Sequence, residues 1–175
     1  MKKAIFLLLI FISFSINAQD NYDLSTLRIG PFKYGMKETD MRKVANTKFN
    51  NGKDKYGNEV AIANYNGEKI EIALSQIYAG ENQPSAIGIY NLTTKSPKFK
   101  TKSGIGVGST KDQLLDAYRN YPNYSVNQMW DEKTSKKSTT ESSFTLSDSD
   151  SNTELFFRMI NNVVTEVNVH MSEGC

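Results

Sequence analysis

The sequence predicts an α+β fold, built as a tandem repeat of a helix plus an antiparallel meander, with the helices packed on one face of the sheet. Three observations lead to this prediction. A short glycine-containing motif occurs twice, 73 residues apart. Each copy is followed by a stretch with apolar residues at helical spacing. Runs of alternating apolar and polar residues joined by turn sequences come next, which is typical of antiparallel strands.

The repeated motif is an apolar residue, any residue, a second apolar residue and a glycine, followed by a polar helix start. Phe32 aligns with Ile105, and Gly35 aligns with Gly108. A lysine-rich segment that contains Pro97 then joins the two halves. The predicted divisions are a signal peptide at 1–18, a first α+β repeat at 19–95 and a second at 96–175.

Two helices are expected, at about 37–47 and 110–120. Ser109 suits the N-cap of the second helix, and Asp112 lies in its first turn, where the helix dipole favours an acid. Pro122 follows its end. The apolar positions are Met41, Val44 and Ala45 in the first helix and Leu114, Leu115, Ala117 and Tyr118 in the second.

Strands are expected in both halves. Asn66-Gly67 and Asn161-Asn162 predict tight hairpin turns. Residues 131–142 are polar and predict a mobile loop. The expected strands are 60–65, 69–78, 86–92, 143–147, 153–160 and 163–169, with 124–130 as a candidate for one more.

The first eighteen residues have the layout of a cleavable secretory signal. Lys2 and Lys3 precede an apolar run, and a short polar stretch ends at Ala18. The apolar run is shorter than the roughly 20 residues that a spanning helix needs, and a lipoprotein would have cysteine where Gln19 stands. The expected protein is therefore periplasmic or secreted and has no stable membrane anchor.

Charge and cysteine content exclude some classes of partner and linkage. The chain has 21 basic and 19 acidic residues, and the first eighteen contain two lysines and no acid. The remainder is neutral, which argues against nucleic acid as a partner because phosphate contacts need basic surfaces. Cys175 is the single cysteine, so no intramolecular disulfide is possible.

Two turn-to-helix segments resemble a known family pattern, GMKE at 35–38 and GVGSTK at 106–111. The pattern is similar to that of the exported small domains grouped with the outer-membrane assembly lipoprotein BamE (SmpA/OmlA) and the tandem β-lactamase inhibitor protein BLIP. The tandem arrangement is closer to the inhibitor. This chain lacks the lipobox cysteine of the first and the paired cysteines of the second. Both relatives bind proteins and catalyse no reaction, so the resemblance implies a protein-binding module.

Three motifs are candidates for sites of chemistry. The order Gly-Ser-Thr-Lys at 108–111 lacks the Gly-Lys-Ser/Thr of a phosphate loop and indicates a glycine turn before a capped helix. Residues 148–152 alternate oxygen donors like a calcium loop, but Thr153 replaces the glycine of such a loop and a hairpin turn is favoured. His170 shares a strand face with Glu166, about 13 Å away, which is too far for one metal ion. No catalytic residue, metal site or cofactor is predicted.

Aromatic residues near a helix end and a polar loop are the candidate contact residues: Tyr121, Tyr124 and Trp130. Together with the resemblance they favour a non-enzymatic, exported protein-binding module whose partner is another envelope or extracellular protein. A small-ligand, glycan or calcium-binding protein is the alternative. A hydrolase with paired acids has no support from a local motif. The oligomeric state stays open.

Overall fold

The computed structural model describes residues 21–77 and 86–172. This part of the chain is 56% strand and 8% helical, so the predicted α+β class, with a helix plus meander in each repeat, is wrong. The elements are β1 (Leu24–Ser25), β2 (Arg28–Ile29), β3 (Phe32–Lys33), α1 (Glu38–Met41), β4 (Thr47–Lys53), β5 (Glu59–Tyr65), β6 (Glu68–Ile77), β7 (Ala86–Thr94), α2 (Lys111–Tyr118), β8 (Tyr124–Asp131), β9 (Lys136–Asp148), β10 (Thr153–Ile160) and β11 (Val163–Met171).

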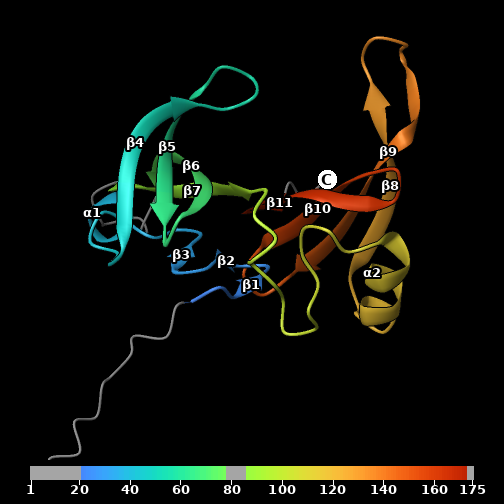
Figure 1. Ribbon diagram of the computed structural model, residues 1–175, viewed down its shortest axis with the longest axis horizontal. Helices are drawn as coiled ribbons and strands as arrows, with labels where there is room; N and C mark the ends of the chain where they lie inside the picture. Colours follow the sequence, from blue (N-terminus) through green and yellow to red (C-terminus); the bar gives the residue numbers. More distant parts are fainter. Residues whose placement is uncertain (1–20, 78–85, 173–175) are drawn as a thin grey trace, which may run out of the picture.

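Eight strands form one antiparallel sheet in the order β4-β5-β6-β7-β11-β10-β9-β8. Strands β7 and β11 join its two halves through the pairs from Val167–Thr94 to His170–Asn91. A small second sheet has the order β1-β2-β3. In Figure 1 this small sheet and α2 lie below the middle strands, and the β4–β5 and β8–β9 hairpins rise above them.

The two helices are shorter than expected and form no continuous layer. Helix α1 is one turn long and ends at Met41; the chain then turns through Asn46, which has a left-handed backbone (φ 57°), and β4 begins at Thr47. Helix α2 matches its prediction more closely. Its N-cap is Thr110 rather than the predicted Ser109, and Thr110 forms a reciprocal capping box with Gln113.

Most predicted strands and both tight turns are present. Asn66 and Gly67 have φ values of 48° and 86°, and Asn161 and Asn162 have 50° and 63°, as a type I′ turn requires. The predicted mobile loop at 131–142 is wrong, because most of it belongs to the long strand β9. Its side chains are polar and half or fully exposed there, so no apolar alternation marks the strand, and pairing with β8 holds it.

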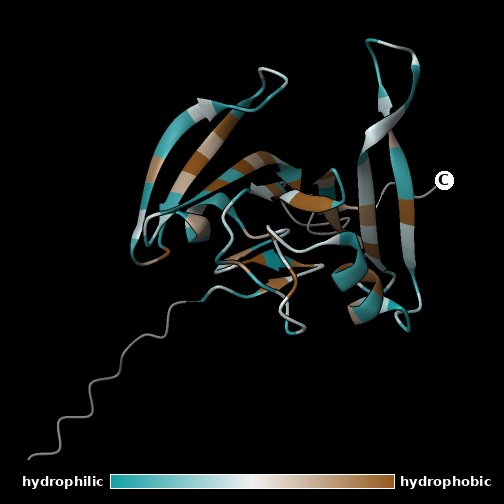
Figure 2. Cartoon of the chain, turned by 45° about the vertical axis from the view of Figure 1, so that its right-hand side comes forward, coloured by the Kyte–Doolittle hydropathy of each residue, from teal (hydrophilic) through white to brown (hydrophobic). Residues whose placement is uncertain are grey.

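The core lies between the inner face of the large sheet and the layer made by β1–β3, α1 and α2. Figure 2 shows the resulting alternation of brown and teal residues along the strands. No helix within the described ranges is long and apolar enough to cross a membrane. The predicted signal peptide and Cys175 lie outside those ranges. The large, fully buried side chains include Ile29, Phe32, Phe99, Leu114, Phe144, Leu155 and Phe157.

Candidate functional site

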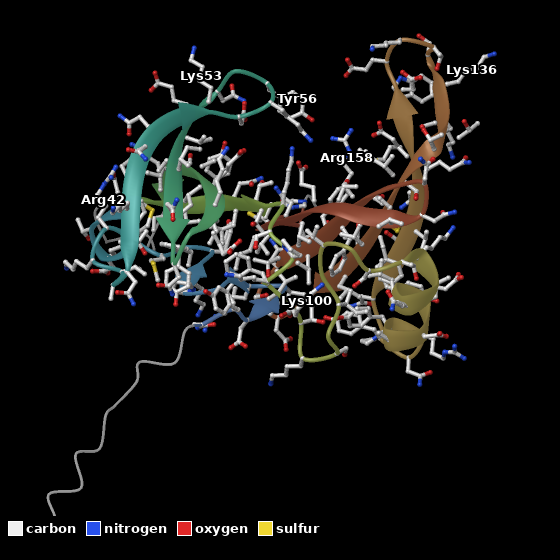
Figure 3. All side chains as sticks on the ribbon, viewed as in Figure 1. Arg42, Lys53, Tyr56, Lys100, Lys136 and Arg158 are labelled. Carbon is white, nitrogen blue, oxygen red and sulfur yellow. The ribbon has the colours of Figure 1, made fainter. Side chains whose placement is uncertain are left out.

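The candidate site is the face of the large sheet that points away from α2 and β1–β3, here called the open face. The β4–β5 and β8–β9 hairpins project from it on either side of the middle strands (Figure 1). Figure 3 shows Tyr56 and Arg158 on this side and Lys100 on the opposite side. The open face is therefore a surface bounded by two hairpins and floored by β7, β11 and β10.

Strand alternation decides which side chains reach the open face. On β11, Val164, Val167 and Val169 are buried in the core, with exposed fractions of 1% or less. Glu166, Asn168 and His170 alternate with Val167 and Val169 and point the other way. The prediction that these three polar residues share one face is confirmed, since all three line the same depression. The predicted apolar row is only partly right, because Val163 is 39% exposed and a register shift brings Val164 into the core instead.

A hydrogen-bonded polar network crosses the middle strands on the open face. The Asn168 side-chain amide donates to Asn91 Oδ1 (2.8 Å) and to Thr93 Oγ1 (2.7 Å) on β7. Asn168 Oδ1 in turn meets His170 Nδ1 at 2.7 Å. His170 Nε2 lies 3.7 Å from Glu154 Oε2 on β10. The network links three strands, and side-chain networks of this kind hold a surface rigid when their members are satisfied.

Glu166 lies on the same face and is more deeply buried than the sequence suggests. It is only 9% exposed, although it belongs to the polar side of β11. Lys55 Nζ approaches one carboxylate oxygen at 3.4 Å and Lys95 Nζ approaches the other at 3.5 Å. Because Lys55 belongs to the β4–β5 loop, this ion pair ties the loop to the middle of the sheet.

Arg158 on β10 forms the second ion pair of the open face. Its Nε donates to Glu141 Oε2 at 3.2 Å. Hydrogen bonding to this carboxylate raises the pKa of Arg158, so the guanidinium stays charged. Each acidic group of these two ion pairs thus has a basic partner on the open face.

A depression of about 480 Å³ lies between the β4–β5 loop and the middle strands. Its aromatic members are Tyr56, Tyr90 and Phe156, and its polar members include Asn91 and His170. Tyr56 is 77% exposed and Tyr90 is 43% exposed. Large, stiff aromatic side chains beside polar groups are enriched at binding surfaces.

Two serine hydroxyls lie near His170 and bond to its neighbour Glu154. Ser147 and Ser172 each donate their hydroxyl to Glu154 Oε1 at 2.9 Å. Neither of these bonds is directed to the imidazole, which a serine nucleophile requires. No group of three or more histidine, cysteine, aspartate or glutamate side chains suited to a metal ion is found within residues 21–77 and 86–172.

The loop with calcium-like spacing is a hairpin turn. Asp148 Oδ1 accepts the backbone N–H groups of Asp150 and Ser151, and its Oδ2 accepts the Thr26 hydroxyl. Hydrogen bonding to Ser151 is the main reason that the pKa of Asp148 is lowered. The carboxylate already serves the turn that joins β9 to β10.

The glycine turn before α2 docks on the sheet. Gly108 donates its N–H to Val164 O at 2.9 Å, and its φ of 89° suits glycine. Ser109 is buried, and its hydroxyl oxygen accepts the N–H of Gly106. The segment therefore leads into α2 as predicted, and these polar groups form hydrogen bonds within the turn and to the adjacent strand.

The three candidate contact residues do not form one patch within a chain. Tyr121 is half-buried against Tyr118, at 6.2 Å between ring centroids, and burial raises its pKa. Tyr124 stacks on Phe144 at 5.4 Å and is 40% exposed. Trp130 is 62% exposed, six residues further along β8, which places it about 20 Å from Tyr124.

Several residues of the open face carried no local sequence signal. Lys55, Tyr56 and Lys95 come from loops. Asn91 comes from a strand predicted for its apolar residues, and Thr93 follows the predicted end of that strand. They meet β11 only through strand pairing between distant segments. The alternation of β11 was the one available signal, and it located Glu166, Asn168 and His170.

Comparison with known proteins found no relative of this chain. No family model, curated protein or solved structure matches it. The resemblance to the BamE and BLIP domains therefore remains a prediction from the two turn-to-helix segments.

Proposed function

We propose that this chain is an exported, non-enzymatic module that binds another protein of the bacterial envelope or exterior through its open face. The single observation that carries the proposal is the exposure of Tyr56 and Tyr90 beside an internally satisfied polar network. A protein partner gains affinity by covering exposed aromatic rings, and a rigid surface loses little conformational entropy on binding. The secretory pattern of residues 1–18 supports export.

The charge pattern of the open face also suits a protein partner. Glu166 is paired with Lys55 and Lys95, and Arg158 is paired with Glu141. A partner that covers these pairs therefore leaves no charge unpaired, and it finds its main apolar contacts at the aromatic rings. Within the described residues no side-chain nitrogen or oxygen is buried without a hydrogen-bond partner.

Photo-crosslinking from defined positions tests this proposal in the native host. A photoreactive amino acid replaces Tyr56 or Tyr90 in the full chain, and a matched control replaces Asp116, whose side chain is 71% exposed on α2. We expect Tyr56 and Tyr90 to label the same protein at least about tenfold more strongly than Asp116 does. Equal labelling from Asp116, or no labelling from the open face, contradicts the proposal.

Affinity for the identified protein provides the second test. Tyr56→Ala combined with Tyr90→Ala is expected to weaken binding at least about tenfold, and Asp116→Ala is expected to leave it unchanged. A robust enzymatic turnover that a point substitution abolishes would contradict the non-enzymatic part of the proposal.

The depression beside Tyr56 supports a second candidate, a small polar ligand such as a glycan. Its aromatic rings provide flat apolar contacts, and the side-chain amide nitrogen of Asn91 provides a directional hydrogen-bond donor. Calorimetric titration with oligosaccharides of the host cell wall tests this candidate. Binding that Tyr56→Ala removes would favour it over a protein partner.

A further inference from the structure

The large sheet ends in two outer strands, β4 and β8. The outer side of an edge strand presents unpaired N–H and C=O groups, and monomeric proteins protect such edges with lysine, proline, bulges or short strands. The two edges of this sheet are protected to very different degrees.

Strand β4 carries two lysines and a glycine within seven residues, in the sequence TKFNNGK. Strand β8 has the sequence YSVNQMWD, without lysine, arginine, proline or glycine. Its one charged residue is Asp131, at its end, and its one irregularity lies between Gln128 and Trp130. Residues 124–128 are therefore a regular, uncharged edge.

The hydrogen bonds to β9 show which groups of β8 point outward. Ser147 donates its backbone N–H to Asn123 O at 2.9 Å. Because bonding direction alternates along an antiparallel strand, Tyr124, Val126 and Gln128 direct their N–H and C=O groups away from β9. No element within residues 21–77 and 86–172 pairs with this outer side, and Figure 1 shows β8 at the right-hand margin of the sheet.

We propose that β8 pairs with β8 of a second copy of this chain, antiparallel about a two-fold axis at Val126. In this register Val126 of each copy faces Val126 of the other. Tyr124 of each copy faces Gln128 of the other, so this pair occurs twice. Two-fold interfaces are self-complementary in this way. Asp131 lies outside the paired segment 124–128, which is uncharged, so no like charges meet within it.

The same pairing brings Tyr124 and Trp130 of different copies to the same end of the paired segment. Gln128 of one copy lies opposite Tyr124 of the other, and Trp130 follows Gln128 after the irregularity in β8. An exposed tryptophan (62%) and a tyrosine (40%) at the two ends of an open edge then bury apolar surface on pairing.

Sedimentation of the full chain between about 1 μM and about 300 μM tests the proposal, with reductant present to prevent a Cys175 disulfide. We expect a reversible dimer. Val126→Lys is expected to raise its dissociation constant at least about tenfold, because two lysines would face each other. Asn50→Lys, at an exposed position of the other edge strand β4, is expected to leave it unchanged.

Val126→Pro provides a second variant, since it removes an N–H that points outward and an edge strand tolerates proline there. It is expected to keep the circular dichroism spectrum of the parent and to lose the dimer. The proposal is overturned by a single-chain mass across the whole concentration range. A dimer that survives both Val126 substitutions in folded protein would also overturn it. These outcomes do not depend on whether the open face binds a partner.

Discussion

The two halves of the large sheet are docked in the same way but covered differently. Gly35 donates its N–H to Ile89 O at 2.8 Å on β7, and Gly108 donates to Val164 O at 2.9 Å on β11. The repeated glycine turns thus attach to the two strands that meet at the centre of the sheet. The cover that follows each turn differs, since α1 is a single turn and α2 has eight residues.

The small sheet β1–β3 supplies the cover that α1 does not provide. Phe32 packs edge-on against Phe49 and Tyr65, with ring centroids 6.1 and 6.3 Å apart. In the other half, Tyr118 of α2 packs against Phe144 at 6.1 Å. A sheet face needs apolar cover of any kind, so a repeated docking motif does not imply a repeated helix.

The largest expected effect on the free energy of unfolding comes from truncating a buried side chain in either cover. Phe32→Ala and Leu114→Ala each empty a fully buried position, and each is expected to lower the free energy of unfolding by about 2–5 kcal/mol. Urea denaturation measures this loss. Lys33→Ala, an exposed neighbour, is expected to change it by less than about 0.5 kcal/mol. If only one of the two substitutions lowered the free energy of unfolding, the two covers would not be equally necessary.

A smaller effect separates the two helix starts. Thr110→Ala removes the capping box of α2 and is expected to cost about 1 kcal/mol. Lys37→Ala at the start of α1 is expected to cost almost nothing, because Lys37 makes no side-chain cap hydrogen bond. Thermal unfolding followed by circular dichroism compares them. Equal losses would mean that α1 contributes more than its one turn suggests.

The smallest effect concerns the junction between the halves, where Glu68 on β6 contacts Lys98 at 2.8 Å and Ser96 at 2.5 Å. Hydrogen bonding to Lys98, then to Ser96, lowers the pKa of Glu68 below its ordinary 4.5. A lowered pKa stabilises the fold above pH 4.5, and this contribution disappears as pH falls through the folded value.

Glu68→Gln is therefore expected to be less stable than the parent at pH 7 and to approach it at acid pH below the folded pKa. Unfolding in urea at a series of pH values measures the difference. A difference that persists unchanged at low pH would show that the carboxylate charge is not the cause.

Part of the candidate site followed from the sequence. The alternation of β11 placed Glu166, Asn168 and His170 on one face, because a strand turns every second side chain to the same side. The near burial of Glu166 did not follow, since it depends on Lys55 and Lys95, which lie far from it in the chain. The predicted contact patch of Tyr121, Tyr124 and Trp130 depends on their proximity in sequence, and an extended strand separates Tyr124 from Trp130.

Local chemistry by itself determined the turns and most strands of this protein. Asn66-Gly67 and Asn161-Asn162 tolerate left-handed backbones, and apolar alternation marks strands that have one buried face. The tertiary structure alone decided the length of α1, the existence of β4 and the strand character of residues 136–142. These depend on pairing and cover from distant segments, because a polar strand exposed on both faces obtains its hydrogen bonds from a neighbour and leaves no periodic pattern in its own sequence.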